Sequence, residues 1–363
     1  MENMFKRTLL GAAIALVSTS AMAEGSDYQV GINSDFNVDV YGVAAMSVFY
    51  QEDGATYDWE NESRIGFRAS KAMFDNVEAF MQIESGYVGD DGEAGKLGAR
   101  DTFLGLRGDW GSVRFGRMLT PMYEIIDWPY SNPGLGRVFD WGGDVKFNRD
   151  RHGNTLRYDS AQLGNFNFSV ATGVGDTSVD DNYWYGASAH LKVAEMITFH
   201  AALETENNRE VKAKVDAKDG YWIYNADGTQ KEWVKPEAAV AGSYADTFGY
   251  IVGFEASLPA GFGLAAAYKS GYSDIIGGDK SEQDSYSIIG QYWRGAWGFK
   301  LGYAANLDSK TAGVKQDDSE EVISGQLMYV HNGFVPYLRV GQHDAYNATD
   351  KSYFVRLGLE YGF

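Results

Sequence analysis

The side chains that most often carry out catalysis are sparse in this 363-residue sequence and form no catalytic motif. None of the five histidines lies in a Gly-x-Ser-x-Gly or His-Glu-x-x-His motif, the patterns that place a nucleophile or a zinc ion beside a base. The absence of cysteine excludes thiol catalysis, disulfide bonds and Cys-ligated metal sites. The sequence therefore predicts a protein that is not an enzyme and that needs no metal or cofactor.

Arginines at regular spacing point instead to a charged surface. Arg64 and Arg68 alternate with the apolar residues Ile65 and Phe67, and Arg157 is flanked by apolar residues in the same way. Successive side chains of a strand point to opposite faces. If the apolar face meets lipid, a charge on that face near the midplane would cost about 2–4 kcal/mol, so we expect the arginines to face a lumen. Alternatively, they only pair with neighbouring carboxylates and stiffen the wall.

Strands are the elements that would position these arginines. Throughout the chain, segments of about ten residues alternate between apolar and small or polar side chains. A sustained helical period is almost absent, so we expect an all-β protein with little helix. The sixteen candidate strands begin near Asn37, Glu60, Asn76, Ala99, Ser112, Asn154, Asn165, Asn182, Ile197, Tyr244, Phe262, Gln283, Trp297, Glu320, Phe334 and Ser352.

The connections between these segments alternate in length. Short ones, such as Asp109–Gly111 and Ala194–Met196, are interleaved with long ones at about 118–153 and 209–243. This pattern is typical of a transmembrane antiparallel β-barrel with short periplasmic turns and long extracellular loops. A soluble β-sandwich needs neither that pattern nor the 15% aromatic content. The 50 acidic residues against 31 basic ones, a formal charge of −19, argue against a nucleic-acid partner.

Both ends of the chain suggest export. Residues 1–23 combine the basic Lys6 and Arg7, a short apolar run and the small-residue pattern Ala-Met-Ala, which together predict a cleaved signal peptide. A membrane helix is the alternative, but the apolar run is shorter than the roughly 20 residues needed to span a bilayer. Residues 24–363 would then be a single barrel domain. The last strand ends on Phe363 and resembles the C-terminal signal that the barrel-assembly machinery reads in outer-membrane proteins.

The chain also resembles the trimeric general porins of Gram-negative outer membranes. That resemblance implies a homotrimer in contact with outer-membrane lipid and lipopolysaccharide. It further implies that the third long loop, at about 118–153, folds into the lumen. The expected function is passive diffusion of ions and small hydrophilic solutes. The stretches that carry the resemblance are Val38–Gly42, Ser63–Arg68, Ala99–Arg117 and Asn154–Ser160.

The same resemblance implies a charged pore constriction, with acidic residues of the loop facing arginines of the wall. The alternation of side chains along a strand conflicts with this implied constriction at Arg117. If Arg117 faces the lumen, Arg114 should face outward and Phe115 inward. Arg137 also adds positive charge to the loop, so we expect only a weak cation preference. The implied constriction residues are Arg64, Arg117 and Arg157 on the wall, Asp140 and Asp144 in the loop, and Glu84 behind the arginines.

Aromatic residues in the two long connections leave a second function open. Aromatic faces can stack on the apolar C–H faces of sugar rings, so the protein could instead be a substrate-selective oligosaccharide porin. Alternatively, the rings only anchor folded loops and the membrane interface. The candidate sugar-stacking residues are Tyr123, Trp128, Trp141 and Trp222.

Overall fold

The computed structural model describes residues 37–363 apart from 53, 55, 89–94, 132, 133, 135, 141, 214–216, 218, 220, 225–229, 237, 239, 240 and 347. The predicted signal peptide and the candidate residue Trp141 lie outside this range. Among the described helices, none has the length and apolar character needed to cross a membrane.

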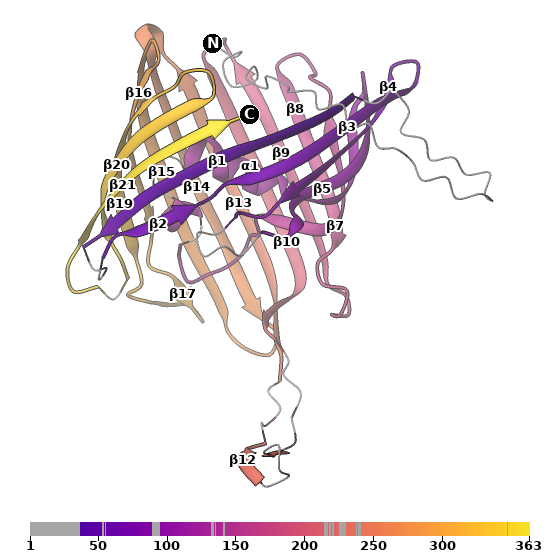
Figure 1. Cartoon of the computed structure of the whole chain (residues 1–363), viewed down its shortest axis with the longest axis vertical. Helices are drawn as coiled ribbons and strands as arrows, with labels where there is room; N and C mark the ends of the chain where they lie inside the picture. The colour runs from indigo at the N-terminus through magenta and orange to yellow at the C-terminus, as the bar shows by residue number, and fades with distance from the viewer. Residues whose placement is uncertain are drawn as a thin grey trace.

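Sixteen long strands of the described chain form one antiparallel sheet that closes on itself (Figure 1). Each strand pairs with the next along the chain, and the last pairs with the first. This confirms the predicted barrel. The strands are β1 (Asn37–Gln51), β3 (Arg64–Phe74), β4 (Val77–Ser85), β5 (Leu97–Gly108), β6 (Gly111–Leu119), β7 (Arg151–Ser160), β8 (Phe166–Val174), β9 (Tyr183–Val193), β10 (Ile197–Lys212), β13 (Ser243–Ser257), β14 (Phe262–Ile275), β15 (Lys280–Arg294), β16 (Trp297–Asn306), β19 (Glu320–Tyr329), β20 (Phe334–Asp344) and β21 (Ser352–Gly362).

The remaining elements lie in the connections. The second barrel strand begins at Arg64 rather than at Glu60, because Asp58–Asn61 forms a separate short strand, β2, that pairs with β1. The hairpin β11–β12 stands beyond the end of the barrel (Figure 1). The shorter elements are β11 (Tyr221–Tyr224), β12 (Gln230–Val234), β17 (Lys310–Thr311), β18 (Val314–Lys315), α1 (Pro121–Ile125), η1 (Ile126–Tyr130), η2 (Gly136–Asp140) and η3 (Pro259–Gly261).

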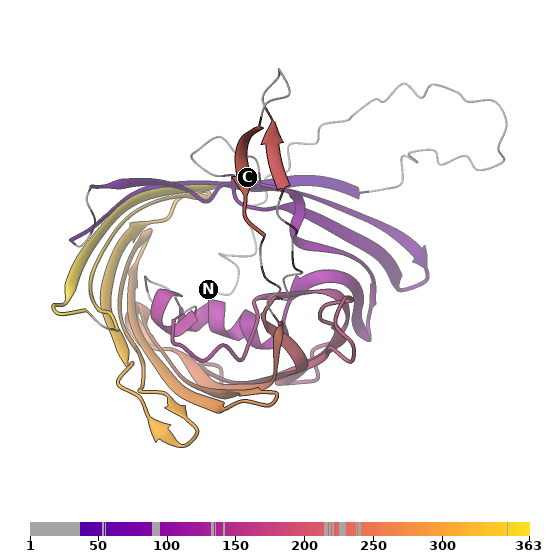
Figure 2. The same cartoon turned by 90° about the horizontal axis from the view of Figure 1, so that it is seen from below.

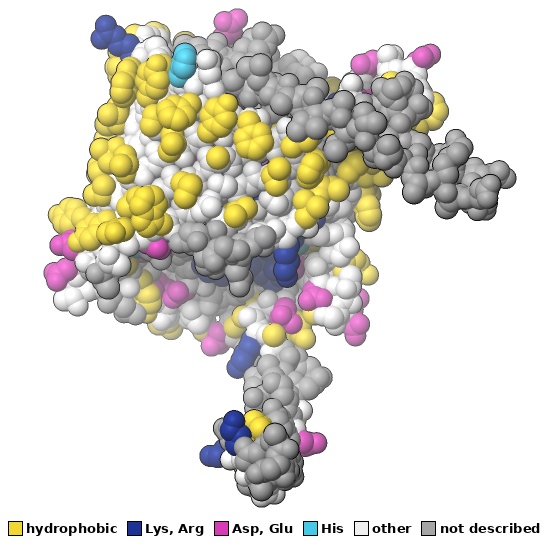
Figure 3. Space-filling view, viewed as in Figure 1, with side chains coloured by type: hydrophobic (Ala, Val, Ile, Leu, Met, Phe, Trp, Pro, Cys, Tyr) yellow, Lys and Arg dark blue, Asp and Glu magenta, His cyan; other side chains and the backbone are white. Residues whose placement is uncertain are grey.

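The outer face of the barrel is apolar, as the alternation predicts. Figure 3 shows a broad band of hydrophobic side chains across the face of the wall in view. Leu104, Phe115 and Leu156 are 63%, 62% and 50% exposed. A contiguous apolar surface of this kind is what contact with lipid requires. The barrel therefore presents its apolar residues to the membrane and keeps the alternate positions for the lumen.

A β-bulge between β6 and β7 lies beside the two arginines of β6 whose faces conflict. The register between β6 and β7 shifts between Gly116 and Met118. The extra residue lies on β7, because the pairing advances by three positions there against two on β6. Gly116 has a φ of 144°, so β6 also departs from regular alternation between Phe115 and Arg117. Arg114 bonds an inward carboxylate, and Arg117 lines the lumen further along. The expectation that Phe115 faces inward was wrong, since its side chain faces the lipid.

The long connection between β6 and β7, residues 120–150, is called the inner loop here. Figure 2 looks along the barrel and shows α1 inside the ring of strands, nearer to the pink and orange strands than to the indigo ones. Within this loop, α1 packs on β8, β9, β10 and β13, η1 on β14 and β15, and η2 on β15, β16 and β19. We call these eight strands the docked wall. The strands β1, β3, β4 and β5 across the lumen form the open wall.

Candidate channel constriction

The inner loop is held against the docked wall by an apolar core inside the barrel. The loop contributes large side chains, and the wall contributes mostly small ones such as Ala202 and Ala304. Phe147 lies over Gly249 and Gly271, a cross-strand pair, where a Cβ atom would come within 2.3 or 2.4 Å of its ring. Only glycine allows this approach. The fully buried loop side chains of this core are Met122, Ile126, Tyr130, Val138 and Phe139.

Buried polar contacts fix the start of the loop. At its start, the Thr120 side chain accepts a hydrogen bond from the Tyr123 N–H at 3.1 Å and caps α1. Arg157 reaches from β7 to the Glu124 carboxylate at 2.6 Å and to the Asp159 carboxylate at 2.7 Å. The Arg157 side chain is 3% exposed, so it anchors the loop from a buried position and does not line open water.

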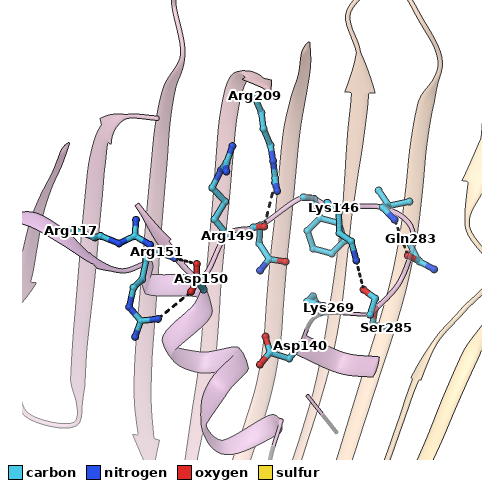
Figure 4. Close-up of a pocket in the computed structure, with 14 residues that line it drawn as sticks. Arg117, Asp140, Lys146, Arg149, Asp150, Arg151, Arg209, Lys269, Gln283 and Ser285 are labelled. Carbon is cyan, nitrogen blue, oxygen red and sulfur yellow. Dashed lines mark hydrogen bonds and ion pairs between the residues drawn. The ribbon is translucent and has the colours of Figure 1, made fainter. Parts of the chain in front are cut away.

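The two acidic residues predicted for the loop lie in different environments. Asp140 is 8% exposed, accepts a hydrogen bond from the Tyr123 hydroxyl at 3.0 Å and lies near Lys269 (Figure 4). Burial raises the pKa of the Asp140 carboxyl to about 7, although the Tyr123 hydrogen bond and the Lys269 charge oppose the rise. Asp144, by contrast, is exposed at the loop surface.

The open wall carries a cluster of arginines around one buried carboxylate. Glu84 on β4 is 7% exposed and accepts a hydrogen bond from the Tyr41 hydroxyl at 2.7 Å. Arg100 donates to the same carboxylate, and Arg64 lies 3.8 Å from it. Arg68 stacks on the Tyr41 ring at 3.9 Å. The structure thus places Glu84 among arginines whose charged ends face the lumen.

The inner loop presents Asp127 toward this cluster and exposes Trp128 beside it in the sequence. Both side chains are exposed, and because the loop lies inside the barrel, the water they touch is that of the lumen. Desolvation within the lumen raises the pKa of Asp127, while the charges of Arg100, Arg151 and Arg64 oppose that rise. An acidic residue of the loop therefore lies within electrostatic reach of the arginines of the wall.

The predicted sugar-stacking residues also lie in different environments, some exposed and others buried. Trp128 is 49% exposed and carries the Lys300 ammonium 4.5 Å from its ring centroid. Tyr123 is 6% exposed and packs into the loop core. The backbone of Trp222 pairs within the hairpin β11–β12, beyond the end of the barrel. Of the described candidates, Trp128 is the one whose ring meets lumen water.

Sequence reasoning assigned no role to Arg100, Arg151 or Lys300, although each contacts a lumen residue. Lys300 alternates with Phe299 and Leu301, which are 48% and 50% exposed on the lipid face, so the alternation rule could have identified it. Arg100 was harder to place, because the pairing of β4 with β5 is irregular beside it.

Comparisons with known proteins agree with this geometry. A family model described as Gram-negative porin matches residues 11–333. The chain is 51% identical to the chitoporin of Vibrio furnissii over the full length of both proteins. It is 25% identical to a monosaccharide porin of a Halomonas species, over 75% of this chain and 78% of that protein.

A solved structure has the same fold. The trimer form of OmpT, an outer membrane protein of Vibrio cholerae, aligns with a TM-score of 0.65 and 15% identity, covering 90% of this chain and 99% of that chain. The family match covers most of the sequence, and the relative at 51% identity spans all of it. The chain belongs to the Gram-negative porin family and is a β-barrel channel of the outer membrane.

Proposed function

We propose that this porin conducts oligosaccharides, chitin fragments in particular, and binds them at the constriction as they pass. The relative with 51% identity over both full lengths is named a chitoporin, and a more distant one is named a monosaccharide porin. General diffusion of ions and small hydrophilic solutes, which the sequence also predicts, is the second candidate. The two differ in whether a sugar resides in the pore or only passes through it.

The observation that carries the sugar proposal is the exposed ring of Trp128. One side of the indole is in contact with the Lys300 ammonium, which is itself 4% exposed and therefore fixed in place. The remaining surface, 49% of the residue, is open to the lumen. A rigid aromatic face beside a fixed ammonium group offers what a sugar ring needs, an apolar platform and a polar group at its edge.

The charged residues would set the orientation of the solute and the passage of ions. The proposed constriction consists of Arg64, Arg117 and Glu84 on the wall, with Asp127 facing them from the loop. Arg157 and Asp140 would hold the loop in place from behind, and Asp144 would contribute charge at its surface. We retain a weak cation preference as part of the proposal, since acidic residues outnumber basic ones, 50 to 31, in the chain as a whole.

The assembly and orientation complete the proposal. The trimer form of the OmpT structure supports a homotrimer. We infer that the long connections face the cell exterior and the lipopolysaccharide, and that residues 1–23 direct export. Phe363 exchanges backbone hydrogen bonds with Gly42 of the first strand at 3.0 and 3.1 Å, which extends the pairing that closes the barrel. We also propose that β21 is the strand that the barrel-assembly machinery reads.

Single-channel recording in a planar bilayer tests the sugar proposal. We expect stable conductance that closes in three steps, and transient blockade of the current by the hexamer of N-acetylglucosamine. Replacing Trp128 by Ala should weaken that binding by roughly 1–2 kcal/mol, about five- to thirty-fold, because the stacking surface is lost. The variant Trp128→Phe should retain part of the affinity.

Trp297 supplies a matched control, since it is 54% exposed on the lipid face. The hexamer should block the current through the Trp297→Ala variant as strongly as it blocks the current through the unaltered protein. Open conductance without any blockade by the hexamer would contradict the sugar proposal and leave the general diffusion pore.

A further inference from the structure

A cavity of about 330 Å³ adjoins the inner loop on the side of the long connections (Figure 4). Arg117 lies near the end of β6 and Arg209 near the end of β10, and both strands lead into long connections. We call this cavity the basic vestibule. Its cationic lining residues are Arg117, Lys146, Arg149, Arg151, Arg209 and Lys269.

The acidic residues of the vestibule already form hydrogen bonds or ion pairs within the protein. Asp150 bonds the backbone N–H of Arg151 at 2.6 Å and its guanidinium at 3.2 Å. Asp140 is 8% exposed and accepts from Tyr123. Behind the lining, Glu206 is 1% exposed, and its carboxylate lies 2.8 Å from Arg149 and 3.9 Å from Arg209. One buried carboxylate therefore serves two guanidinium groups.

Arg149 and Arg117 use only part of their guanidinium donors in bonds to described residues. Arg149 bonds Glu206 through Nε and Nη2, and its side chain is 35% exposed. Arg117 donates through Nε to the Ala99 carbonyl at 2.8 Å and forms no ion pair with a described residue. Lys146 is exposed on the loop and donates to the Gly143 carbonyl at 2.6 Å. Figure 4 shows Arg149 and Arg209 between Arg117 on one side and Lys146 on the other.

We propose that the basic vestibule binds the oxyanion group, phosphate or carboxylate, of a small solute that enters from the long-connection side. Guanidinium groups present planar pairs of N–H donors that match two oxygens of a phosphate or carboxylate. The volume is within the range of sites that hold small molecules. The inference rests on the channel function alone and does not require sugar stacking at Trp128; it adds acidic sugars to the solutes that the pore selects.

Three sugars that differ in charge test the vestibule in planar bilayers. Glucose, glucuronate and glucose 6-phosphate are added to the long-connection side, and the concentration that halves the ion current is measured. We expect that concentration to fall from glucose to glucuronate to glucose 6-phosphate, by about tenfold in total, because charge-assisted hydrogen bonds strengthen with the charge of the oxyanion.

Two substitutions test whether the stronger blockade by glucose 6-phosphate arises in the basic vestibule. Arg149→Gln removes a guanidinium whose side chain is 35% exposed, and Lys146→Gln removes an ammonium of the loop and not of the barrel wall. Each should raise the half-blocking concentration of glucose 6-phosphate by about threefold to tenfold and leave that of glucose unchanged. Lys315 is the matched control, because it is 71% exposed in the hairpin β17–β18 and pairs with Asp308. The variant Lys315→Gln should behave as the unaltered protein does.

Equal blockade by glucose and glucose 6-phosphate would overturn the proposal, as would a preference for glucose 6-phosphate that survives the two substitutions together. Either result leaves the oligosaccharide proposal standing, because blockade by the N-acetylglucosamine hexamer is read separately. Unchanged conductance with glucose verifies that the inner loop of each variant still docks.

Discussion

The docked wall and the open wall belong to one sheet with one alternation rule, yet their lumen faces carry opposite chemistry. Under the inner loop, the inward positions include Ala202, Ile251 and Ala304, and the buried charge Lys269 meets a loop carbonyl at Phe139. Across the lumen, the inward positions are Tyr41, the arginine cluster and Glu84. The first face is complementary to protein, and the second is complementary to water and charged groups.

This difference explains how a wide barrel acquires a narrow, one-sided pore. A loop that crossed the lumen without an apolar seat would bury polar backbone without compensation. Small wall residues let the large side chains of the loop pack closely, which secures it to one side. The unoccupied side then forms the passage, and we propose that its arginines, with Asp127 opposite, determine what the solute meets.

The largest expected effect comes from removing the anchor between the two regions. Replacing Arg157 by Ala removes the ion-pair partner of Glu124 and one of the two partners of Asp159, which keeps Arg114. The two carboxylates are 37% and 23% exposed, so solvent compensates part of the loss, and we expect a cost of roughly 1–3 kcal/mol. We expect a marked fall in the thermal unfolding midpoint in detergent and noisier channels as the loop detaches.

Lys280→Ala provides the control for that experiment. Lys280 pairs with Glu282 at the exposed surface, so its loss should change the unfolding free energy by less than about 1 kcal/mol. An unaltered midpoint in the Arg157→Ala variant would show that the apolar core alone holds the loop.

A smaller effect is expected from the protonation of Asp140 at the docked side. Its pKa is raised to about 7, so between about pH 4 and this value the folded protein binds a proton more readily than the unfolded chain. This group therefore contributes a loss of stability as the pH rises through that window. In Asp140→Asn, that part of the pH dependence should vanish. Unfolding midpoints at several pH values measure it, and parallel curves for both proteins would refute it.

The smallest effect on stability, and a clear one on transport, is expected on the open side. Arg64→Ala and Arg117→Ala should each change the unfolding free energy by less than about 1 kcal/mol, because both side chains are partly exposed to the lumen. Each should widen the pore, raise its conductance and shift the reversal potential in a salt gradient toward cation selectivity. If neither variant shifts that potential, the assignment of these arginines to the constriction is wrong.

Much of the wall could be predicted from the sequence, because strand alternation is local. The starts of β1, β10 and β14 were predicted at the observed residues, Asn37, Ile197 and Phe262. The alternation of Arg64 with Ile65 also assigned the correct faces, since Ile65 is 41% exposed on the lipid side. The same rule failed at Phe115, because a bulge depends on how two neighbouring strands pair and not on either strand alone.

The inner loop was beyond that kind of prediction. Asp127 and Asp140 lie in the same loop, and nothing in their neighbouring residues distinguishes the one that meets lumen water from the buried one. Trp128 and Tyr123 are likewise both aromatic residues of one short segment, yet one ring is open and the other enclosed. The sequence determined the barrel, its lipid face and the row of inward arginines, because those follow from a period of two residues. The tertiary structure alone decided which loop residues meet the solute, because that depends on contacts such as Phe147 over Gly249 and Gly271, between residues about one hundred or more positions apart.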